Sequence, residues 1–182
     1  ILGLDADFLG VDPGAVRATR EFSEARRLES AADAKTMPRF YAVEANFSIT
    51  GSNADHRLRL PSSEVERYLR ALCKKLVADH GVDLGPAAAA LGEPSTDGIP
   101  AKWLDAVAKD LAGHRGSALV VAGPEQPPRV HALVHLLNEA LGNTGKTVRY
   151  EVPVDARTVD PAEDVAALAE AMKAGQVDTL VI

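Results

Sequence analysis

Two histidines are the first candidates for chemistry in this sequence. His131 and His135 stand four positions apart, a spacing that places both imidazoles on one face of a helix, where they can hold zinc. The glutamate of an HExxH motif is absent, and the only cysteine, Cys73, lies in an apolar helical pattern. We therefore expect solvated or hydrogen-bonded histidines, a cysteine packed in the core, and neither a metal ion nor an iron–sulfur cluster held by this segment.

Two glycine-containing stretches have the composition of ligand-binding loops. Residues 140–147 fit a permissive phosphate-binding loop, but they follow a predicted helix and precede a predicted strand, the reverse of the order that phosphate binding needs. We expect a glycine-terminated helix and a tight turn there. Residues 123–128 join the end of a predicted strand to a helix, where ligands of open α/β sheets bind. This loop has the better geometry of the two. We nevertheless expect a purely structural strand-to-helix turn, with ligand contact as the alternative, because the glycine triplet of the dinucleotide fingerprint is missing and Glu125 stands where an anion would lie.

A third candidate is the polar loop at residues 53–57. It gathers Asp55, His56 and Arg57, which together can perform acid–base chemistry. Side chains of adjacent loop residues usually point apart, so we expect instead an ion pair that anchors the loop. The sequence has no serine or cysteine in a nucleophile-elbow motif, and hydrolase chemistry therefore has no support.

The elements that must position these residues follow from the hydrophobic pattern. Apolar runs predict strands at residues 1–4, 39–45, 117–122, 147–152 and 177–182. Helical spacing predicts helices at residues 15–28, from Pro61 to a stop at Gly81 with Ser62 as its cap, at 100–114, from Pro127 to Gly142, and at 161–174. Residues 48–59 are predicted as a polar loop, and residues 81–100 as a loop with one alanine-rich turn. The alternation predicts a three-layer α/β/α, Rossmann-like domain with a mainly parallel sheet.

Composition limits the classes of protein that remain. The 182 residues are 46% hydrophobic and 25% charged, which is typical of one globular domain over residues 1–182. A net charge of −6 argues against a nucleic-acid-binding protein. No apolar run is long enough for a membrane span, and no signal peptide is recognisable. Because predicted strands lie at both ends, we expect this domain to be a segment of a longer polypeptide.

Several phrases of the sequence resemble a known family. Residues 117–123 are followed by Gln126-Pro127-Pro128, His131-Ala132-Leu133 and residues 138–145. Together these stretches are similar to the strand–turn–helix segment of molybdopterin oxidoreductases. Residues 1–9 and 50–58 resemble one branch of that family, the large molybdopterin-like iron–sulfur subunit of bacterial alternative complex III, a quinol-oxidising respiratory assembly. The resemblance covers nearly the whole chain.

The resemblance implies a domain that acts as a scaffold without its own cofactor, within a subunit whose iron–sulfur clusters lie in other domains. The implied partners are the other domains of the parent chain and further respiratory subunits, and the parent would be membrane-associated on the periplasmic side. If a pterin were bound, the strand end and the glycine-rich turn would supply Gly123, Gln126 and Asn143. Two alternatives stay open: a catalytic molybdopterin-dependent oxidoreductase, and a generic nucleotide-binding α/β module.

Overall fold

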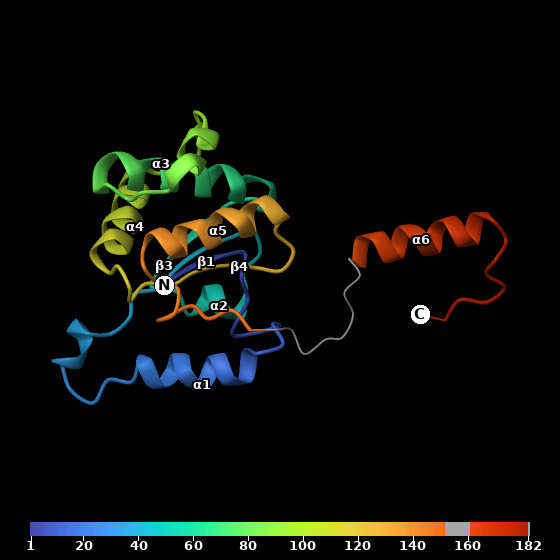
Figure 1. Ribbon diagram of the computed structural model, residues 1–182. Coiled ribbons are helices and arrows are strands. Elements are labelled where there is room, and N and C mark those ends of the chain that lie inside the picture. Colours follow the sequence, from blue (N-terminus) through green and yellow to red (C-terminus); the bar gives the residue numbers. More distant parts are fainter. Residues whose placement is uncertain (152–160, 182) are drawn as a thin grey trace. The chain divides into compact units, whose positions relative to one another are not determined.

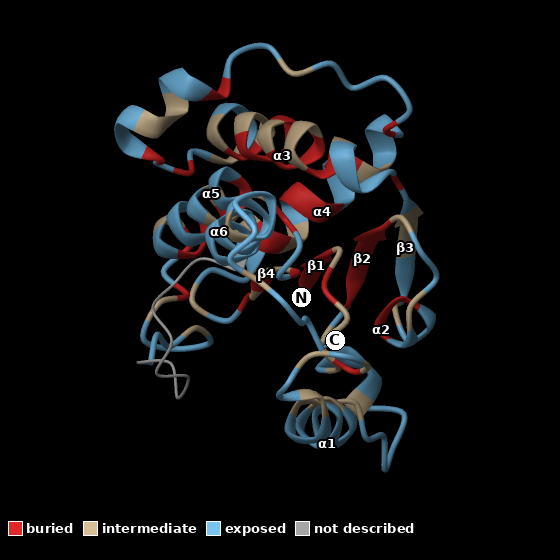
Figure 2. Cartoon of the chain, turned by 90° about the vertical axis from the view of Figure 1, so that its right-hand side faces the viewer, coloured by how far each residue is buried: buried red, intermediate tan, exposed pale blue. Residues whose placement is uncertain are grey.

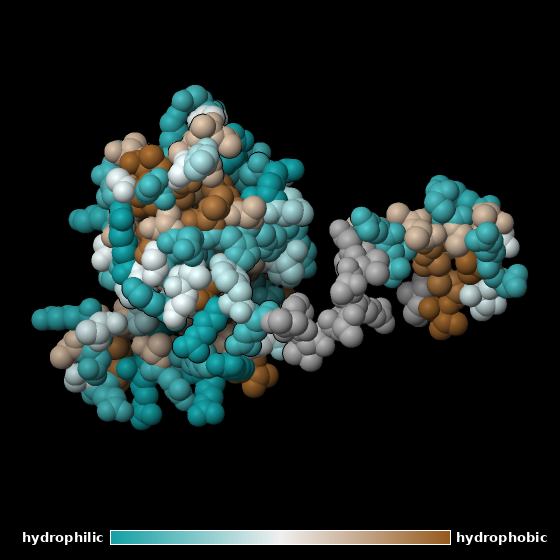
Figure 3. Space-filling model, in the orientation of Figure 1, coloured by the Kyte–Doolittle hydropathy of each residue, from teal (hydrophilic) through white to brown (hydrophobic). Residues whose placement is uncertain are grey.

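The computed structural model describes residues 1–151 and 161–181 (Figure 1). The chain divides into two compact units, Ile1–Arg149 and Tyr150–Ile182. The first unit holds the sheet and the second holds the helix α6 (Pro161–Lys173), which confirms the helix predicted there. That helix exposes an apolar stripe of Val165, Leu168 and Met172 (Figure 3). The expectation of one domain over residues 1–182 stays a prediction.

A four-stranded, wholly parallel sheet forms the centre of the first unit. Its strands lie in the order β3-β2-β1-β4. Their bounds are β1 (Leu2–Leu4), β2 (Tyr41–Glu44), β3 (His56–Arg59) and β4 (Val120–Ala122). Leu4 at the end of β1 pairs with Val43 on one side and with Ala122 on the other. All four strands therefore end at the same edge of the sheet, which we call the carboxyl edge.

Helices cover both faces of this sheet, which confirms the three-layer prediction. One face is covered by α3 (Val65–His80), α4 (Ala101–Gly113) and α5 (Pro128–Ala140). The other carries α1 (Ala15–Ala25) and the short α2 (Ile49–Ser52) (Figure 1). Figure 2 shows buried residues along β1 and β2 and on the inner sides of α3, α4 and α5. By contrast, α1 has no buried residue, and its Phe22 packs edge-on against Phe40 with ring centroids 5.8 Å apart.

The helix α3 supplies the largest part of the core. Its buried residues recur at helical spacing, as predicted, and include Tyr68, Leu69 and Leu72. Gly81 ends the helix in the left-handed conformation that glycine adopts without steric cost. The prediction of Ser62 as the cap is wrong, because residues Ser62–Glu64 form a 3₁₀ turn, η2, and no side chain caps α3. The predicted alanine-rich turn is present as the 3₁₀ helix η3 (Gly85–Leu91).

The prediction of a polar loop at residues 48–59 is wrong, because this stretch contains both α2 and β3. Ser48 caps α2 by accepting a hydrogen bond from the Gly51 amide at 2.8 Å. β3 is an edge strand and is half exposed, so its residues are mostly polar and do not show the apolar run that indicates a buried strand.

The last two predicted strands are also wrong over the residues that are described. Within residues 147–151 only Val148 forms a β-bridge, an isolated one with Thr144. Residues 177–181 are irregular, and residues 152 and 182 lie outside the described part. A strand that extended the sheet next to β4 would have to pair with the outer side of that strand. There the side chain of Asn138 already accepts from the Val120 amide at 3.1 Å and donates to its carbonyl at 2.8 Å. Among the described helices, none is long and apolar enough to cross a membrane.

Candidate functional site

A cavity of about 340 Å³ opens at the carboxyl edge of the sheet. Open α/β sheets bind ligands at this edge, next to the point where the order of the strands reverses. Here the reversal occurs at β1, because β2 and β3 are added on one side of it and β4 is added on the other. The cavity is lined by Asp5, Asp7, Glu44, Ala45, Asn46, Ser48, Ser62 and Glu125.

Asp5 ties together the loops that follow three of the strands. Its backbone has a φ of 49°, a left-handed conformation that is uncommon for a residue other than glycine. One carboxylate oxygen, Oδ1, accepts from the Ala45 amide after β2 at 3.0 Å. The other, Oδ2, accepts from Nε2 of Gln126 after β4 at 2.9 Å. The contacts of this side chain with its neighbours explain why the chain tolerates the strained backbone.

Gly123 is required by a close approach within the chain. A Cβ atom at this position would lie 1.8 Å from the carbonyl oxygen of Asp5, so no other residue fits without displacing the β1 loop. The Gly123 amide also donates to the carbonyl of Leu4 at 2.9 Å, which continues the pairing of β4 with β1. The space that a side chain would fill is therefore taken by this chain's own backbone.

Glu44 is the most buried acid of the site, with 5% of its surface exposed. Its carboxylate forms an ion pair with Nε of Arg57 at 2.5 Å and accepts from Oγ of Ser48 at 2.5 Å. Gly51 in α2 leaves room for it, because a Cβ there would lie 1.7 Å from Oε1 of Glu44. The charge of Glu44 is thus neutralised within the fold, as burial of a carboxylate demands.

The acids on the β1 side of the cavity have no such cation. Asp7 accepts from the Thr50 amide at 3.0 Å through Oδ1. Burial, together with the negative charges of Asp7 and Glu125, raises the pKa of Asp12. Glu125 is exposed, and neither Asp12 nor Glu125 forms an ion pair within the described residues. The site therefore carries a surplus of negative charge.

The residues predicted to contact a pterin do not all meet at this edge. Gly123 and Gln126 lie there, whereas Asn143 is fully buried at the opposite end of β4. Its Nδ2 donates to Asn138 at 3.0 Å and its Oδ1 accepts from the Gly116 amide at 3.2 Å, so both ends of its amide are engaged. Sequence reasoning missed Asp5, Asp7 and Glu44, although all three lie within three residues of the end of a predicted apolar strand, which is the signal that would have found them.

The other candidate loops serve the fold. In the 140–147 stretch, Gly142 and Gly145 are left-handed and the amides of Lys146 and Thr147 both donate to the carbonyl of Asn143, which confirms the predicted turn. At the 53–57 loop the expected anchoring ion pair is present, but Asp55 pairs with Arg26 at 2.7 Å and not with Arg57.

The Arg26 hydrogen bonds hold the pKa of Asp55 below its usual value. The neighbouring His56 stacks on Tyr41, with ring centroids 5.0 Å apart. The pair His131 and His135 belongs to no metal-ligand cluster within the described residues. Cys73 is buried, as expected, and burial raises the pKa of its thiol to about 12.

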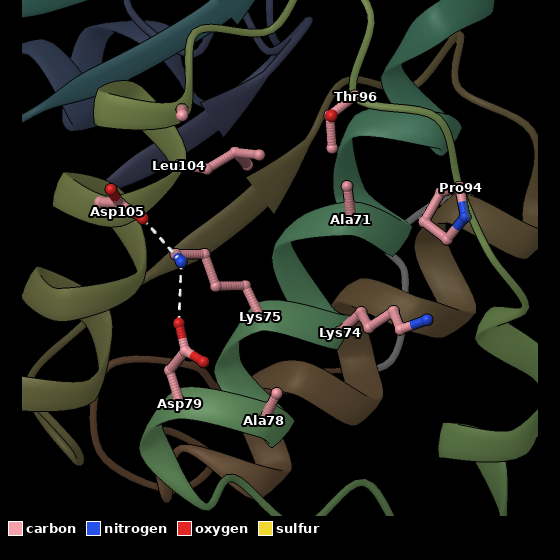
Figure 4. Close-up of a pocket in the computed structure, with 10 residues that line it drawn as sticks. Ala71, Lys74, Lys75, Ala78, Asp79, Pro94, Thr96, Leu104 and Asp105 are labelled. Atoms are coloured by element: carbon pink, nitrogen blue, oxygen red, sulfur yellow. Dashed lines mark hydrogen bonds and ion pairs between the residues drawn. The ribbon is translucent and has the colours of Figure 1, made fainter.

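A second cavity, of about 310 Å³, lies between α3 and α4 (Figure 4). Half of its lining side chains are apolar, and the other half are charged or polar. Lys75 points between Asp79 and Asp105, with its Nζ 2.7 Å and 2.6 Å from their carboxylates. Lys74 contacts Glu93. Both lysines are paired with acids of the chain, so this cavity offers no unpaired cation to an anionic ligand.

Comparison with protein families and with curated proteins identifies no relative of this chain. No protein-family model and no curated protein matches the chain. The resemblance of the sequence to molybdopterin oxidoreductases therefore rests on the phrases quoted above.

The carboxyl edge does not fit the phosphate of a pterin or a dinucleotide. Phosphate sites in such folds use the free amides at the start of a helix, with glycines or cations close by. Here α5 is preceded by Pro127 and begins with Pro128, and proline has no amide hydrogen to donate. Glu125 lies just before them, and Asp5 and Asp7 line the cavity. The groups that face the cavity from β1 and β4 would repel a phosphate.

Proposed function

We propose that this chain is an α/β scaffold domain of a molybdopterin-oxidoreductase-like iron–sulfur subunit of the alternative complex III type. In this proposal the domain performs no redox chemistry and holds neighbouring domains and subunits of a quinol-oxidising respiratory complex. Iron–sulfur clusters belong to other domains of the parent, which is associated with the periplasmic side of a bacterial inner membrane. The proposal combines the family resemblance with the chemistry of the carboxyl edge.

One observation carries the proposal. At the edge where this fold binds cofactors, the chain's own groups take the places of a ligand: the Asp5 carbonyl fills the space beside Gly123, and the Asp5 carboxylate binds Ala45 and Gln126. A domain that held a phosphate-bearing cofactor would need donors and cations there. A rigid edge built from internal contacts supports a structural role instead.

The test is a direct assay for the cofactor. The chain and its full-length parent are purified anaerobically, molybdenum is measured by mass spectrometry, and pterin by fluorescence after oxidation. We expect neither in stoichiometric amount for the residues that form this domain. One molybdenum or one pterin per chain would overturn the scaffold proposal in favour of a catalytic molybdopterin enzyme.

Calorimetry tests the remaining alternative, a generic nucleotide-binding α/β module. Titration of the chain with NAD, FAD and ATP is expected to give no binding heat, because the acids Asp7, Asp12 and Glu125 oppose an anionic ligand at the carboxyl edge. Saturable binding of any of the three would establish a nucleotide-binding module.

A further inference from the structure

Three large apolar side chains are exposed around the acidic cavity. Val11, Phe47 and Ile49 have 81%, 73% and 60% of their surface exposed. Exposed apolar side chains that gather in one place mark an interaction site. With the acids Asp7, Asp12 and Glu125, these three residues form what we call the docking surface.

Hydrogen bonds place two of these apolar residues beside Asp7. The Val11 amide donates to the Asp7 carbonyl at 3.1 Å. The Thr50 amide, next to Ile49, donates to the Asp7 carboxylate at 3.0 Å, so Val11 and Ile49 flank Asp7. Phe47 stands between Asn46 and Ser48, which both line the cavity. Each of the three apolar residues is therefore bonded to, or next in the chain to, a group at the acidic cavity, and we call the three the apolar rim.

The groups at the acidic cavity call for a hydrogen-bond donor with a positive charge. None of the residues that line the cavity is basic. Arg57 is committed to Glu44 and to the Asn46 carbonyl, and its guanidinium lies over the Phe47 ring, 4.9 Å from the centroid, which leaves the opposite face of that ring for a partner.

We propose that the docking surface binds a basic, apolar segment of a partner protein, with a lysine or arginine side chain in the cavity and apolar neighbours against Val11, Phe47 and Ile49. This inference rests on the proposed scaffold role and names the chemistry of the partner. Charge complementarity selects a basic segment and excludes an acidic one, while the apolar rim supplies the contact area.

The experiment uses two synthetic peptides, one of alternating lysine and leucine and one of alternating glutamate and leucine, with binding measured by fluorescence anisotropy. We expect the lysine peptide to bind and the glutamate peptide not to bind. The double variant D12N/E125Q should weaken binding of the lysine peptide by about 10-fold, and F47S should weaken it several-fold. Raising the salt concentration should weaken the wild-type complex, because the attracting charges are near the surface.

A matched control separates local from overall charge. The double variant D97N/E139Q removes one aspartate and one glutamate charge from exposed sites outside the docking surface, and it should leave binding unchanged. Urea unfolding of each variant checks that the fold is kept. Equal binding of both peptides, equal loss in the two double variants, or no binding at all would overturn the inference.

Self-association is the remaining outcome. If sedimentation shows dimers that D12N/E125Q abolishes, the occupant is a second copy of this chain and the inference of a foreign partner is wrong. The cofactor assay stays independent of these results, since molybdenum or pterin in the chain would overturn the scaffold role whether or not the peptide binds.

Discussion

The side chain of Asn138 replaces a neighbouring strand for Val120. Its Oδ1 accepts from the Val120 amide at 3.1 Å and its Nδ2 donates to the Val120 carbonyl at 2.8 Å, and both residues are buried. Asn143 supports it by donating to the same Oδ1 at 3.0 Å. An amide side chain on α5 thus satisfies the outer edge of β4, which would otherwise lack partners.

Replacement of Asn138 tests this arrangement. Asn138→Ala leaves the amide and carbonyl of Val120 buried and unpaired, and should lower the free energy of unfolding by about 2–4 kcal/mol. Urea unfolding followed by circular dichroism measures the change. Asn53→Ala, at an exposed position, is the control and should change stability by less than about 1 kcal/mol. A similar small loss for Asn138→Ala would show that the edge of β4 does not depend on this amide.

Gly123 offers a second test, because the Asp5 carbonyl occupies the position of its missing Cβ. Gly123→Ala should destabilise the fold by about 2–4 kcal/mol, since the nearest atom belongs to the backbone and cannot rotate away. The matched control is Gly113→Ala in α4, where a Cβ meets no atom within 4 Å. That change should be neutral or stabilise the helix by up to about 1 kcal/mol. Equal effects of the two substitutions would contradict the close contact.

The Asp55–Arg26 pair predicts a loss of stability in acid. The hydrogen bonds from Arg26 lower the pKa of Asp55, so the folded state favours the ionised carboxylate more than the unfolded state does. The contribution of the pair is therefore complete above the ordinary value of 3.8 and is lost as the pH falls through the lower, folded-state pKa.

Unfolding at a series of pH values measures this contribution. Asp55→Asn should cost about 1–2 kcal/mol at pH 7, and its difference from the wild type should shrink below pH 4. Asp97→Asn, at an exposed position, should follow the wild type at every pH. A difference for Asp55→Asn that does not change with pH would exclude the ion pair as its cause.

Cys73 predicts slow chemical labelling. The side chain is fully buried, and burial raises the pKa of its thiol to about 12, so both access and the thiolate fraction are low. At pH 8 a disulfide reagent should label the folded chain roughly 1000-fold or more slowly than the chain in urea. Rapid labelling without denaturant would show that α3 opens locally and is not part of a stable core.

Strong periodic signals explain which parts of the fold were predicted from sequence. The apolar strands at β1, β2 and β4 and the helices α3, α4 and α5 carry long patterns, and their type was predicted correctly. The sequence does not predict β3, because an exposed edge strand has no apolar run. It predicts a strand over residues 147–151 because apolar character does not show whether a partner strand is free. That partner edge depends on Asn138, a tertiary contact that the local sequence does not encode.

The candidate site was predicted only in part, for a related reason. Gly123 and Gln126 were recognised from their place after a strand, but Asn143 was grouped with them through a loop that lies at the other end of β4. Asp5 joins residues 45 and 126, which are far from it in sequence, so its role appears only when the order of the strands is known.

The place of β1 in the middle of the sheet has a consequence for the order of folding. β1, β2 and β3 all lie within the first 60 residues, so this half of the ladder can close early, over shorter connections than the one between β1 and β4. Leu4 must also pair with Ala122, and that contact closes a loop of more than 100 residues. Pairing over such a separation slows folding. During synthesis β1 therefore leaves the ribosome before the other three strands, but its pairing is the last to be completed. Its edge toward β4 stays without a partner until β4 has also left the ribosome.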